Sequence, residues 1–324
     1  MDGMGDKSSN ASSTICTSTQ SDKTDSPFQK AESLDKRLKL FVWGESGVGK
    51  TTLALQFPRP AVIDLEGGTD LYAGAFDFDV IRVTTADEVA EAVGWLRTNS
   101  HPYRTLIVDP ITVYWESLQQ KWSSIFLRRN KNSKGHKFEF YDLQPRDWMT
   151  VKAEFKDLAR QLVGLDLNVI VTARAKVQYA DSGFMQAVGH TFDCEKSLPY
   201  LFDAIVRLHR DDQGRFVGTC MKDRSNQLPR GEFEASYGLF EQAFGEDALA
   251  RPARPAALAT QDQVQQLEDH IERFRMTPQQ VSRRLASHDA GSLEELTQEN
   301  AQRILNMFEP ALANEGGAAH HTEE

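Results

Sequence analysis

The sequence predicts an α/β fold whose central sheet is mostly parallel. Short apolar segments, typical of buried strands, alternate along the chain with amphipathic segments typical of helices. A parallel sheet with helices on both faces produces this alternation. A glycine-rich loop joins the first strand to the first helix, and the turn at 211–214 separates two later strands. Those two strands are expected to form an antiparallel hairpin at the edge of the sheet.

Each element is expected where the hydrophobic pattern and the capping residues coincide. Buried strands are expected at 38–43, 62–65, 80–83, 105–108, 168–172, 204–208 and 215–221. Helices are expected from the glycine-rich loop to residue 57, over 86–97 with Thr85 as N-cap, and over most of 113–165. The polar segment 128–137 interrupts the last of these, and 176–199 is expected to be a long polar loop.

The composition is that of a soluble protein without a general affinity for polyanions. The chain has 324 residues, of which 40% are hydrophobic and 26% charged, and its formal net charge is -10. A polyanion would therefore need a local basic patch. The three cysteines, Cys16, Cys194 and Cys220, are too widely spaced for a disulfide framework or a zinc motif. A cytoplasmic location is expected, and because no apolar run reaches the length of a membrane span, no membrane partner is expected.

Composition also divides the chain into five segments. The polar residues 1–37 are expected to be a disordered tail. A large core domain is expected over 38–250, and "RPARPAALA" at 251–259 is interpreted as a linker. A small helical domain is expected over 260–311, followed by a disordered tail at 312–324. The expected N-caps of its helices are Thr260, Thr277, Ser292 and Thr297.

The glycine-rich loop "GESGVGKT" has the pattern G-x-x-x-x-G-K-[ST] between a strand and a helix. Glycines let the backbone N–H groups face phosphate oxygens, and the N-terminus of the helix adds a partial positive charge. Lys50 is expected to reach the β- and γ-phosphates of ATP, and the Thr51 hydroxyl to bind Mg²⁺. The residues expected to bind the nucleotide are Gly44, Glu45, Ser46, Gly47, Val48, Gly49, Lys50, Thr51 and Thr52.

The metal ion needs an acidic partner, and the segment "TLIVDP" supplies one. Asp109 follows an apolar strand at its C-terminal end, the edge at which ligands bind in parallel α/β sheets. Asp109 is therefore expected to bind Mg²⁺ together with Thr51. Because Pro110 follows directly, a glutamate beside this aspartate is absent.

Hydrolysis also requires a carboxylate that orients and deprotonates water. The strand after the phosphate-loop helix leads into "AVIDLEGGTD", where Glu66 lies at the C-terminal end. Glu66 would lie beside the γ-phosphate if this strand neighbours the phosphate-loop strand or the strand of Asp109. Glu116 is a weaker competitor as the base. Asp64 is expected to be structural, and Asp70 to be a turn residue.

The order of "GESGVGKTT", "VIDLEGGTD", "LIVDP" and "VIVTAR" resembles the RecA-like ATPase core. The resemblance covers about residues 38–245 and extends to phage-encoded RecA-like ATPases of the single-strand annealing/recombinase group, an AAA-type ATP-binding family. It implies a RecA-like P-loop core that hydrolyses ATP with Mg²⁺ and assembles with itself as a ring or a filament. In such cores the catalytic glutamate lies at the end of the strand after the phosphate-loop helix, which matches Glu66.

Two further motifs acquire a role from the resemblance. "VIVTAR" places Thr172 and Arg174 where RecA-like cores sense the γ-phosphate, although recombinases typically carry Gln there. "MKDRSNQLPRG" places Lys222 and Arg224 on one side of an extended segment, like the Lys-x-Arg finger that reaches the ATP site of a neighbouring subunit. There a cation would stabilise charge on the transferring phosphoryl group. The alternatives are a solvated strand end and a charged loop that keeps an edge soluble.

Two loops are expected to contact single-stranded DNA. The first, 128–137, has no acidic residue, and Phe126, Phe138 and Phe140 flank it for stacking on bases. The alternative for this loop is a solvated insertion. The second loop follows the sensor strand, and its role rests on the resemblance. The expected DNA-binding residues are Arg128, Arg129, Lys131, Lys134, Lys137 and Lys176.

These features predict an ATP-hydrolysing protein that acts on single-stranded DNA in phage-type recombination, by annealing or strand exchange, in the bacterial host cytoplasm. A replicative motor or helicase loader and a non-catalytic ATP-gated binding module are the alternatives. A GTPase is disfavoured because the Asn-Lys pair at 130–131 lacks the aspartate of an Asn-Lys-x-Asp base reader. The helical domain is expected to dock a recombination or replication protein, to modulate access of DNA, or only to pack.

Overall fold

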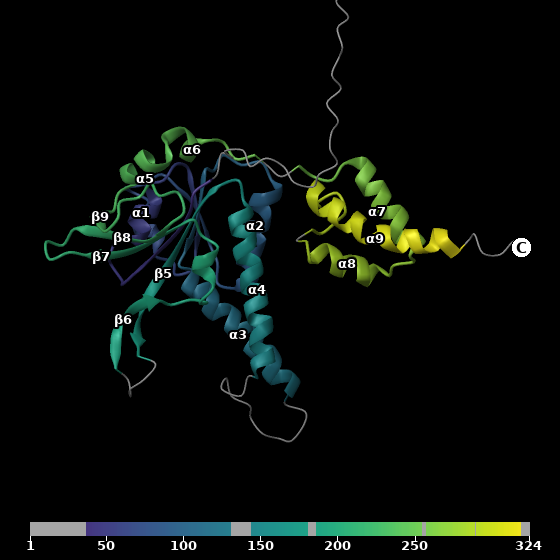
Figure 1. Cartoon of the computed structure of the whole chain (residues 1–324), viewed down its shortest axis with the longest axis horizontal. Coiled ribbons are helices and arrows are strands. Elements are labelled where there is room, and N and C mark those ends of the chain that lie inside the picture. The colour runs from purple at the N-terminus through teal and green to yellow at the C-terminus, as the bar shows by residue number, and fades with distance from the viewer. Residues whose placement is uncertain (1–36, 131–143, 181–185, 255–256, 289, 319–324) are drawn as a thin grey trace, which may run out of the picture. The chain divides into compact units, whose positions relative to one another are not determined.

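A nine-stranded sheet forms the centre of the core in the computed structural model, which describes residues 37–130, 144–180, 186–254, 257–288 and 290–318 (Figure 1). The strand order is β3-β2-β4-β5-β1-β7-β8-β9, and β6 pairs with β5 outside this order. The strands are β1 Lys39–Gly44, β2 Pro60–Asp64, β3 Asp79–Arg82, β4 Thr105–Asp109, β5 Asn168–Tyr179, β6 Ala187–Phe192, β7 Ala204–Arg210, β8 Phe216–Asp223 and β9 Glu232–Glu234.

The sheet is mostly parallel, as the sequence predicts. All pairs from β3 to β7 along the strand order are parallel, whereas β7–β8, β8–β9 and β5–β6 are antiparallel. The predicted hairpin at the sheet edge is therefore confirmed, with β9 added beyond it. The α/β fold class, with a mostly parallel sheet and several C-terminal helices, is confirmed as well.

Helices cover both faces of the sheet. Phe41 of β1 packs into the cluster beneath α2, α3 and α4, whereas Leu40 and Val42 pack into the cluster that includes residues of α1, α5 and α6. A strand buried on both faces requires the continuous apolar run seen in the sequence. The helices are α1 Lys50–Leu55, α2 Ala86–Thr98, α3 Ile111–Asn130, α4 Pro145–Gly164, α5 Tyr237–Phe244, α6 Glu246–Ala250, α7 Gln261–Arg273, α8 Pro278–Ala286 and α9 Gln298–Ala318.

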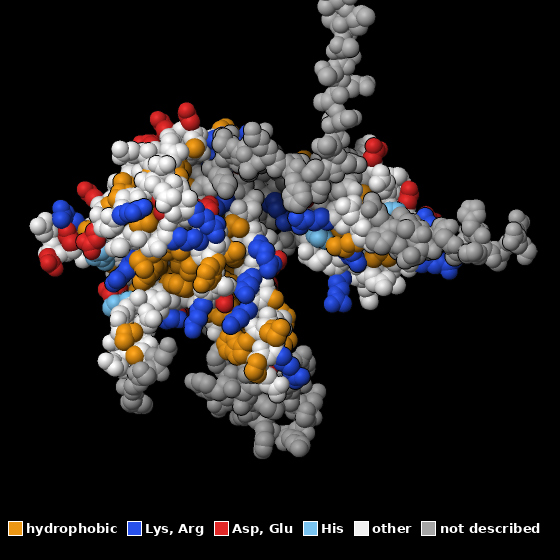
Figure 2. Space-filling model, in the orientation of Figure 1, with side chains coloured by type: hydrophobic (Ala, Val, Ile, Leu, Met, Phe, Trp, Pro, Cys, Tyr) orange, Lys and Arg blue, Asp and Glu red, His pale blue; other side chains and the backbone are white. Residues whose placement is uncertain are grey.

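The helix α4 is amphipathic in a way that bears on function. Its buried side contributes Val151 and Phe155 to the core. On the outer side Lys152 and Arg160 are exposed and Lys156 is half-buried. These three cations recur every four residues and therefore share one side of the helix. Figure 2 shows Lys and Arg side chains gathered along this helix.

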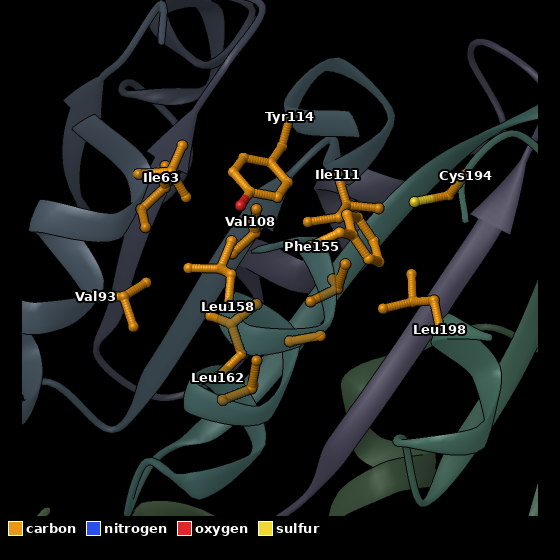
Figure 3. Close-up of a cluster of buried hydrophobic side chains, with 14 of the residues drawn as sticks. Ile63, Val93, Val108, Ile111, Tyr114, Phe155, Leu158, Leu162, Cys194 and Leu198 are labelled. Atoms are coloured by element: carbon orange, nitrogen blue, oxygen red, sulfur yellow. The ribbon is translucent and has the colours of Figure 1, made fainter. Parts of the chain in front are cut away.

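The core cluster beneath α2–α4 holds the strands that carry the predicted carboxylates. Figure 3 shows side chains of β2, β4 and these helices converging in one place. Ile63 of β2, Val108 of β4, Val93 of α2 and Leu158 of α4 are each at most 3% exposed. Burying one large aliphatic side chain stabilises the fold by about 1.5–3 kcal/mol. The cluster therefore fixes the ends of β2 and β4 relative to each other.

Two predicted elements were wrong. The strand at 80–83 was expected to be buried, but β3 forms the edge of the sheet and all four of its residues are exposed. The segment 176–199 was expected to be a loop, but β5 continues to Tyr179 and pairs with β6, and a 3-10 helix, η3, spans Leu198–Tyr200. The two strands of this β5–β6 hairpin satisfy each other's backbone groups while β6 stays largely exposed. Without a buried face they show no apolar alternation, which is the signal that strand prediction requires. The short elements β9, α5 and α6 were also not expected.

The C-terminal helices follow three of the four predicted caps, Thr260, Thr277 and Thr297. The prediction for Ser292 was wrong, because the residues that follow it form turns and bends and no helix begins there. Thr260 and Thr277 each accept a hydrogen bond from the backbone three residues on and complete a capping box, as Thr85 does for α2. α7, α8 and α9 bury a small cluster of their own around Leu267 and Leu296. The domain limits remain a prediction. Among the residues described, none of the helices is apolar enough over a sufficient length to span a membrane.

Candidate active site

The phosphate loop connects the end of β1 to the start of α1. Gly47 and Gly49 adopt φ values of 73° and 89°, the left-handed region that favours glycine. The ring of Phe216, at the start of β8, lies so close to Gly49 that a Cβ there would meet the ring at 2.8 Å. The Arg210 Nε donates to the Gly47 carbonyl at 3.0 Å. The loop is thus supported from the β7–β8 hairpin.

The predicted nucleotide-binding residues do not all face the same way. Val48 is buried, Thr52 is half-buried, and the exposed Glu45 lies 3.5 Å from the His190 Nε2 of β6. Five loop residues line a hollow of about 380 Å³ at the C-terminal edge of the sheet. These loop residues are Ser46, Gly47, Gly49, Lys50 and Thr51. The charged residues that line the hollow from other segments are Asp64, Glu66, Asp109 and Arg174.

Lys50 folds back onto its own loop. Its Nζ donates to the carbonyls of Gly44 at 3.0 Å and Glu45 at 2.7 Å. Burial lowers the pKa of the Lys50 ammonium, and the Asp109 and Glu66 carboxylates oppose this shift. The ammonium is therefore placed at the hollow with carbonyl partners that a phosphate oxygen could replace.

Asp109 ends β4 and accepts two hydroxyl hydrogen bonds. Thr51 Oγ1 donates to its Oδ2 at 2.6 Å, and Thr172 Oγ1 donates to its Oδ1. Burial raises the pKa of the Asp109 carboxyl, although both hydrogen bonds act in the opposite direction. One hydroxyl and one carboxylate, both oxygen donors, fit a Mg²⁺ ion that takes its remaining ligands from phosphates and water. The residues present thus suit the predicted metal.

The strand of Glu66 neighbours the strand of Asp109, which is the condition set by the sequence argument. β2 pairs with β4 with Asp64 beside Asp109, and the Leu65 N–H donates to the Asp109 carbonyl at 3.0 Å. Glu66 follows immediately and lines the hollow. The structure therefore brings together Lys50, Thr51, Asp109 and Glu66 from three separate segments.

Asp64 has a structural role. Its carboxylate accepts hydrogen bonds from the N–H groups of Glu66, Gly67 and Thr69 at 2.8–3.0 Å and from the Thr69 hydroxyl at 2.6 Å. Burial would raise the pKa of this carboxyl, but the four hydrogen bonds hold it below its ordinary value. Asp64 thus shapes the turn on which Glu66 stands. Asp70 lies in the following 3-10 helix and pairs with Arg82.

Glu66 is ion-paired in the structure. The Arg174 Nε and Nη2 lie 2.7 and 2.5 Å from the Glu66 Oε1, and the Arg174 Nη1 lies 3.7 Å from the Glu116 Oε1. Thr172, the other predicted sensor residue, is buried behind Asp109 and does not line the hollow. Of the two, Arg174 is the one that a bound phosphate could reach.

The predicted finger lies at the other end of the sheet. β7 runs parallel to β1, with Leu208 beside Gly44, so the end of β7 lies near the phosphate loop. β8 returns antiparallel and finishes with Asp223 beside Ala204, at the start of β7. Lys222 and Arg224 are therefore separated from their own hollow by the length of the sheet.

Both finger side chains are bound to the segment that precedes β7. The Lys222 Nζ donates to the carbonyls of Pro199 at 2.8 Å and Phe202 at 2.7 Å. The Arg224 Nη2 donates to the Tyr200 carbonyl at 2.8 Å, and its Nη1 lies 3.2 Å from an Asp203 carboxylate oxygen. Burial and the nearby Arg224 lower the pKa of Lys222.

The predicted DNA-binding residues are described only in part. Arg128 is exposed near the end of α3, and Lys176 is exposed but paired with Asp193 at 2.8 Å. The side chain of Arg129, and Lys131, Lys134 and Lys137, lie outside the described residues. The sequence analysis did not single out Lys152, Lys156 and Arg160 on the outer side of α4. Their spacing of four within a helical pattern was the available signal.

Among solved structures, the crystal structure of the RadB recombinase is similar, with 19% sequence identity and a TM-score of 0.39. The match covers 63% of this chain and 88% of that one. No curated protein matches. The family model described as an AAA domain matches residues 36–227, more than half of the chain. The chain therefore belongs to the AAA domain family of P-loop proteins.

Proposed function

We propose that this protein is a Mg²⁺-dependent, RecA-like ATPase that acts on single-stranded DNA as an oligomer, in phage-type recombination in the bacterial cytoplasm. The observation that carries the proposal is the convergence of Lys50, Asp109 and Glu66 on one hollow. A phosphate-binding cation, a metal-binding carboxylate and a second carboxylate are the groups that ATP hydrolysis needs.

Each group has a defined role in the proposed reaction. Lys50 exchanges its loop carbonyls for phosphate oxygens. Thr51 and Asp109 would hold Mg²⁺, which would supply positive charge to offset that of the phosphates. Glu66 accepts a proton from water while the water oxygen forms a bond to the γ-phosphorus. The bond from that phosphorus to the β–γ bridging oxygen breaks, which leaves ADP and phosphate. Glu66 then releases its proton to solvent.

Self-assembly is supported by an exposed apolar surface. β3 is an edge strand. Its residues Val80 and Ile81 and the neighbouring Trp95 of α2 are 37–50% exposed and line a hollow of about 550 Å³. Unpaired edges and exposed apolar patches are typical of protein contacts. An assembly would also give Lys222 and Arg224 access to a neighbour's nucleotide, which they cannot reach in their own chain. A recombination or replication protein is the proposed partner of α7–α9.

DNA binding is supported by the cations of α4. Lys152 and Lys156 form no ion pair or hydrogen bond with any residue that the structure describes, and Arg160 lies 3.5 Å from Asp157. They add local positive charge to a chain whose formal net charge is -10.

The proposed function is tested by measuring ATP hydrolysis with and without single-stranded DNA while oligomer size is followed by light scattering. We expect hydrolysis to require Mg²⁺, to increase at least several-fold with DNA, and to fall to background in Glu66→Gln, which should still bind nucleotide. Hydrolysis that ignores DNA over a range of salt would contradict the DNA role. Normal hydrolysis by Glu66→Gln would transfer the role of base to another group such as Glu116.

The DNA role of α4 has its own quantitative test. Lys152→Ala combined with Lys156→Ala removes two cations, so the slope of log affinity against log salt should become shallower by about 1.4 for a single strand. Fluorescence anisotropy at four or more salt concentrations measures this slope. Arg303→Ala, which removes an exposed, ion-paired cation of α9, is the matched control and should leave the slope unchanged. An unaltered slope in the double variant would exclude α4 from the DNA path.

A further inference from the structure

The contact between Arg174 and Glu66 links two residues that lie 108 positions apart in the chain. The Arg174 backbone is fixed because its N–H donates to the Thr112 hydroxyl at 3.0 Å. Its guanidinium is free to turn, since the Arg174 side chain is 47% exposed, and it has both Glu66 and Glu116 as anionic partners.

The ion pair engages the Glu66 carboxylate, which the proposed ATP hydrolysis requires as a base. Two guanidinium nitrogens lie within 2.7 Å of one Glu66 oxygen. A carboxylate with one oxygen held in this way by a cation is oriented toward that cation and is a weaker acceptor for a proton from water. An exposed ion pair of this kind is weak, and a stronger anion can therefore displace it.

A triphosphate is such an anion. Arg174 lines the same hollow as Lys50 and Thr51, where phosphates are expected to lie. The guanidinium forms two parallel hydrogen bonds to a phosphate as readily as to a carboxylate, and a terminal phosphate carries more charge than Glu66. Binding at this position would draw Arg174 away from Glu66.

We propose that Arg174 is a positioning residue that restrains Glu66 in the empty site and exchanges it for the terminal phosphate of a bound nucleoside triphosphate. The base is then free only when the nucleotide has a third phosphate. The inference rests on the proposed function and deepens it, because it supplies a reason why an empty or diphosphate-bound site stays inactive. The exchange needs no covalent step, only a change of partner for one guanidinium.

A double-mutant cycle on nucleotide affinity tests the exchange without requiring hydrolysis. AMP-PNP binding with Mg²⁺ is measured by calorimetry for the unmodified chain, Glu66→Gln, Arg174→Ala and the double variant. If Glu66 competes for Arg174, Glu66→Gln should tighten AMP-PNP binding by up to about fivefold, which corresponds to about 1 kcal/mol at 1.4 kcal/mol per tenfold. In the Arg174→Ala background this gain should shrink or vanish, and with ADP it should be small in both backgrounds.

Simple repulsion between Glu66 and phosphate gives the opposite pattern. Without Arg174 that repulsion is less compensated, so Glu66→Gln would tighten binding equally or more in the Arg174→Ala background. This result would overturn the exchange. Arg174→Lys keeps the charge but loses the two-pronged geometry, so it should restore part of the coupling, and Arg303→Ala should change nothing. Failure of the unmodified chain to bind AMP-PNP would overturn the proposed function, whereas normal binding without coupling would overturn only the exchange.

Discussion

The two ends of the parallel sheet hold their cations in different ways. At the C-terminal end, Lys50 and Arg174 border an open hollow and are bound to partners that a phosphate can replace. At the other end, Lys222 and Arg224 are bound to the carbonyls of the 199–202 segment, with no phosphate loop beside them. The first end is organised to receive a nucleotide within one chain. The second has the cations of a phosphate site but not the rest of it.

This difference indicates how the two ends would work together. A pair of cations without a phosphate loop becomes useful when another molecule supplies the nucleotide. In the proposed assembly, the N-terminal end of one sheet would complete the hollow of the next subunit. Full ATP hydrolysis by a protein in which only one of the two ends is intact would contradict this arrangement.

The largest effect is expected from a mixture of defective subunits. Arg224→Ala should lower DNA-stimulated hydrolysis by about 10³-fold, because a cation supplied from a neighbour contributes at least that factor in related phosphoryl transfers. Lys50→Ala should abolish hydrolysis through its own hollow. Mixed together, the two variants should recover a measurable fraction of activity, since some sites then combine an intact loop with an intact finger.

Co-assembly of the two variants must be verified in the same mixture by size-exclusion chromatography with distinguishable tags. Recovery is expected to scale with the product of the two subunit fractions, so it should be highest at equal proportions. If co-assembled mixtures recover no activity, Lys222 and Arg224 serve only to hold the 199–202 segment.

A smaller effect is expected from two aspartates that occupy matching places at the two ends. Asp64 shapes the turn after β2, and Asp223 shapes the turn after β8 by accepting hydrogen bonds from Ser225 and Leu228 at 2.6–2.8 Å. Replacing either by Asn should lower the free energy of unfolding by about 1.5–3 kcal/mol, the range for lost hydrogen bonds to a charged group. Denaturant unfolding measures this loss. The activity effects should differ: Asp64→Asn should impair each chain's own hollow, while Asp223→Asn should be rescued by neighbours with intact fingers.

The carboxyl groups of Asp64 and Asp223 also predict how the free energy of unfolding changes as the pH falls. Burial would raise the pKa of both carboxyls, but their hydrogen bonds hold both values below the ordinary 3.8. A depressed pKa adds stability that is fully present above the unfolded value and is lost as pH falls through the folded value. Each Asn variant should therefore show a flatter loss of stability below about pH 4. An acid-unfolding curve as steep as that of the unmodified chain would indicate that these turns do not hold ionised carboxylates.

The sequence was sufficient for features that depend on local signals. The phosphate loop, the apolar strands and the caps at Thr85, Thr260 and Thr277 are each specified within a few residues, and the structure has them where they were predicted. Glu66 required one assumption about neighbouring strands, and the pairing of Asp64 with Asp109 satisfies it. The role of Glu66 in hydrolysis stays a prediction.

Features that depend on distant residues could not be predicted. The ion pair between Glu66 and Arg174 depends on the register of β2, β4 and β5, which no local pattern encodes. The exposed β5–β6 hairpin lacks an apolar face, so its strands resembled a polar loop. The placement of Lys222 and Arg224 at the far end of the sheet follows from the antiparallel direction of β8, and only the hairpin itself was visible in the sequence.

The strand β8 has a mechanical consequence. Its first residue, Phe216, rests on Gly49 of the phosphate loop, and its far end carries Lys222. A strand of eight residues spans about 26 Å and resists stretching because its hydrogen bonds to β7 are nearly continuous. In the proposed assembly one strand would therefore touch two nucleotides, its own chain's at one end and the neighbour's at the other. A shift of the phosphate loop on ATP binding would then be transmitted along β8 to the nucleotide site of the next subunit. The subunits would therefore hydrolyse ATP one after another along the assembly rather than independently.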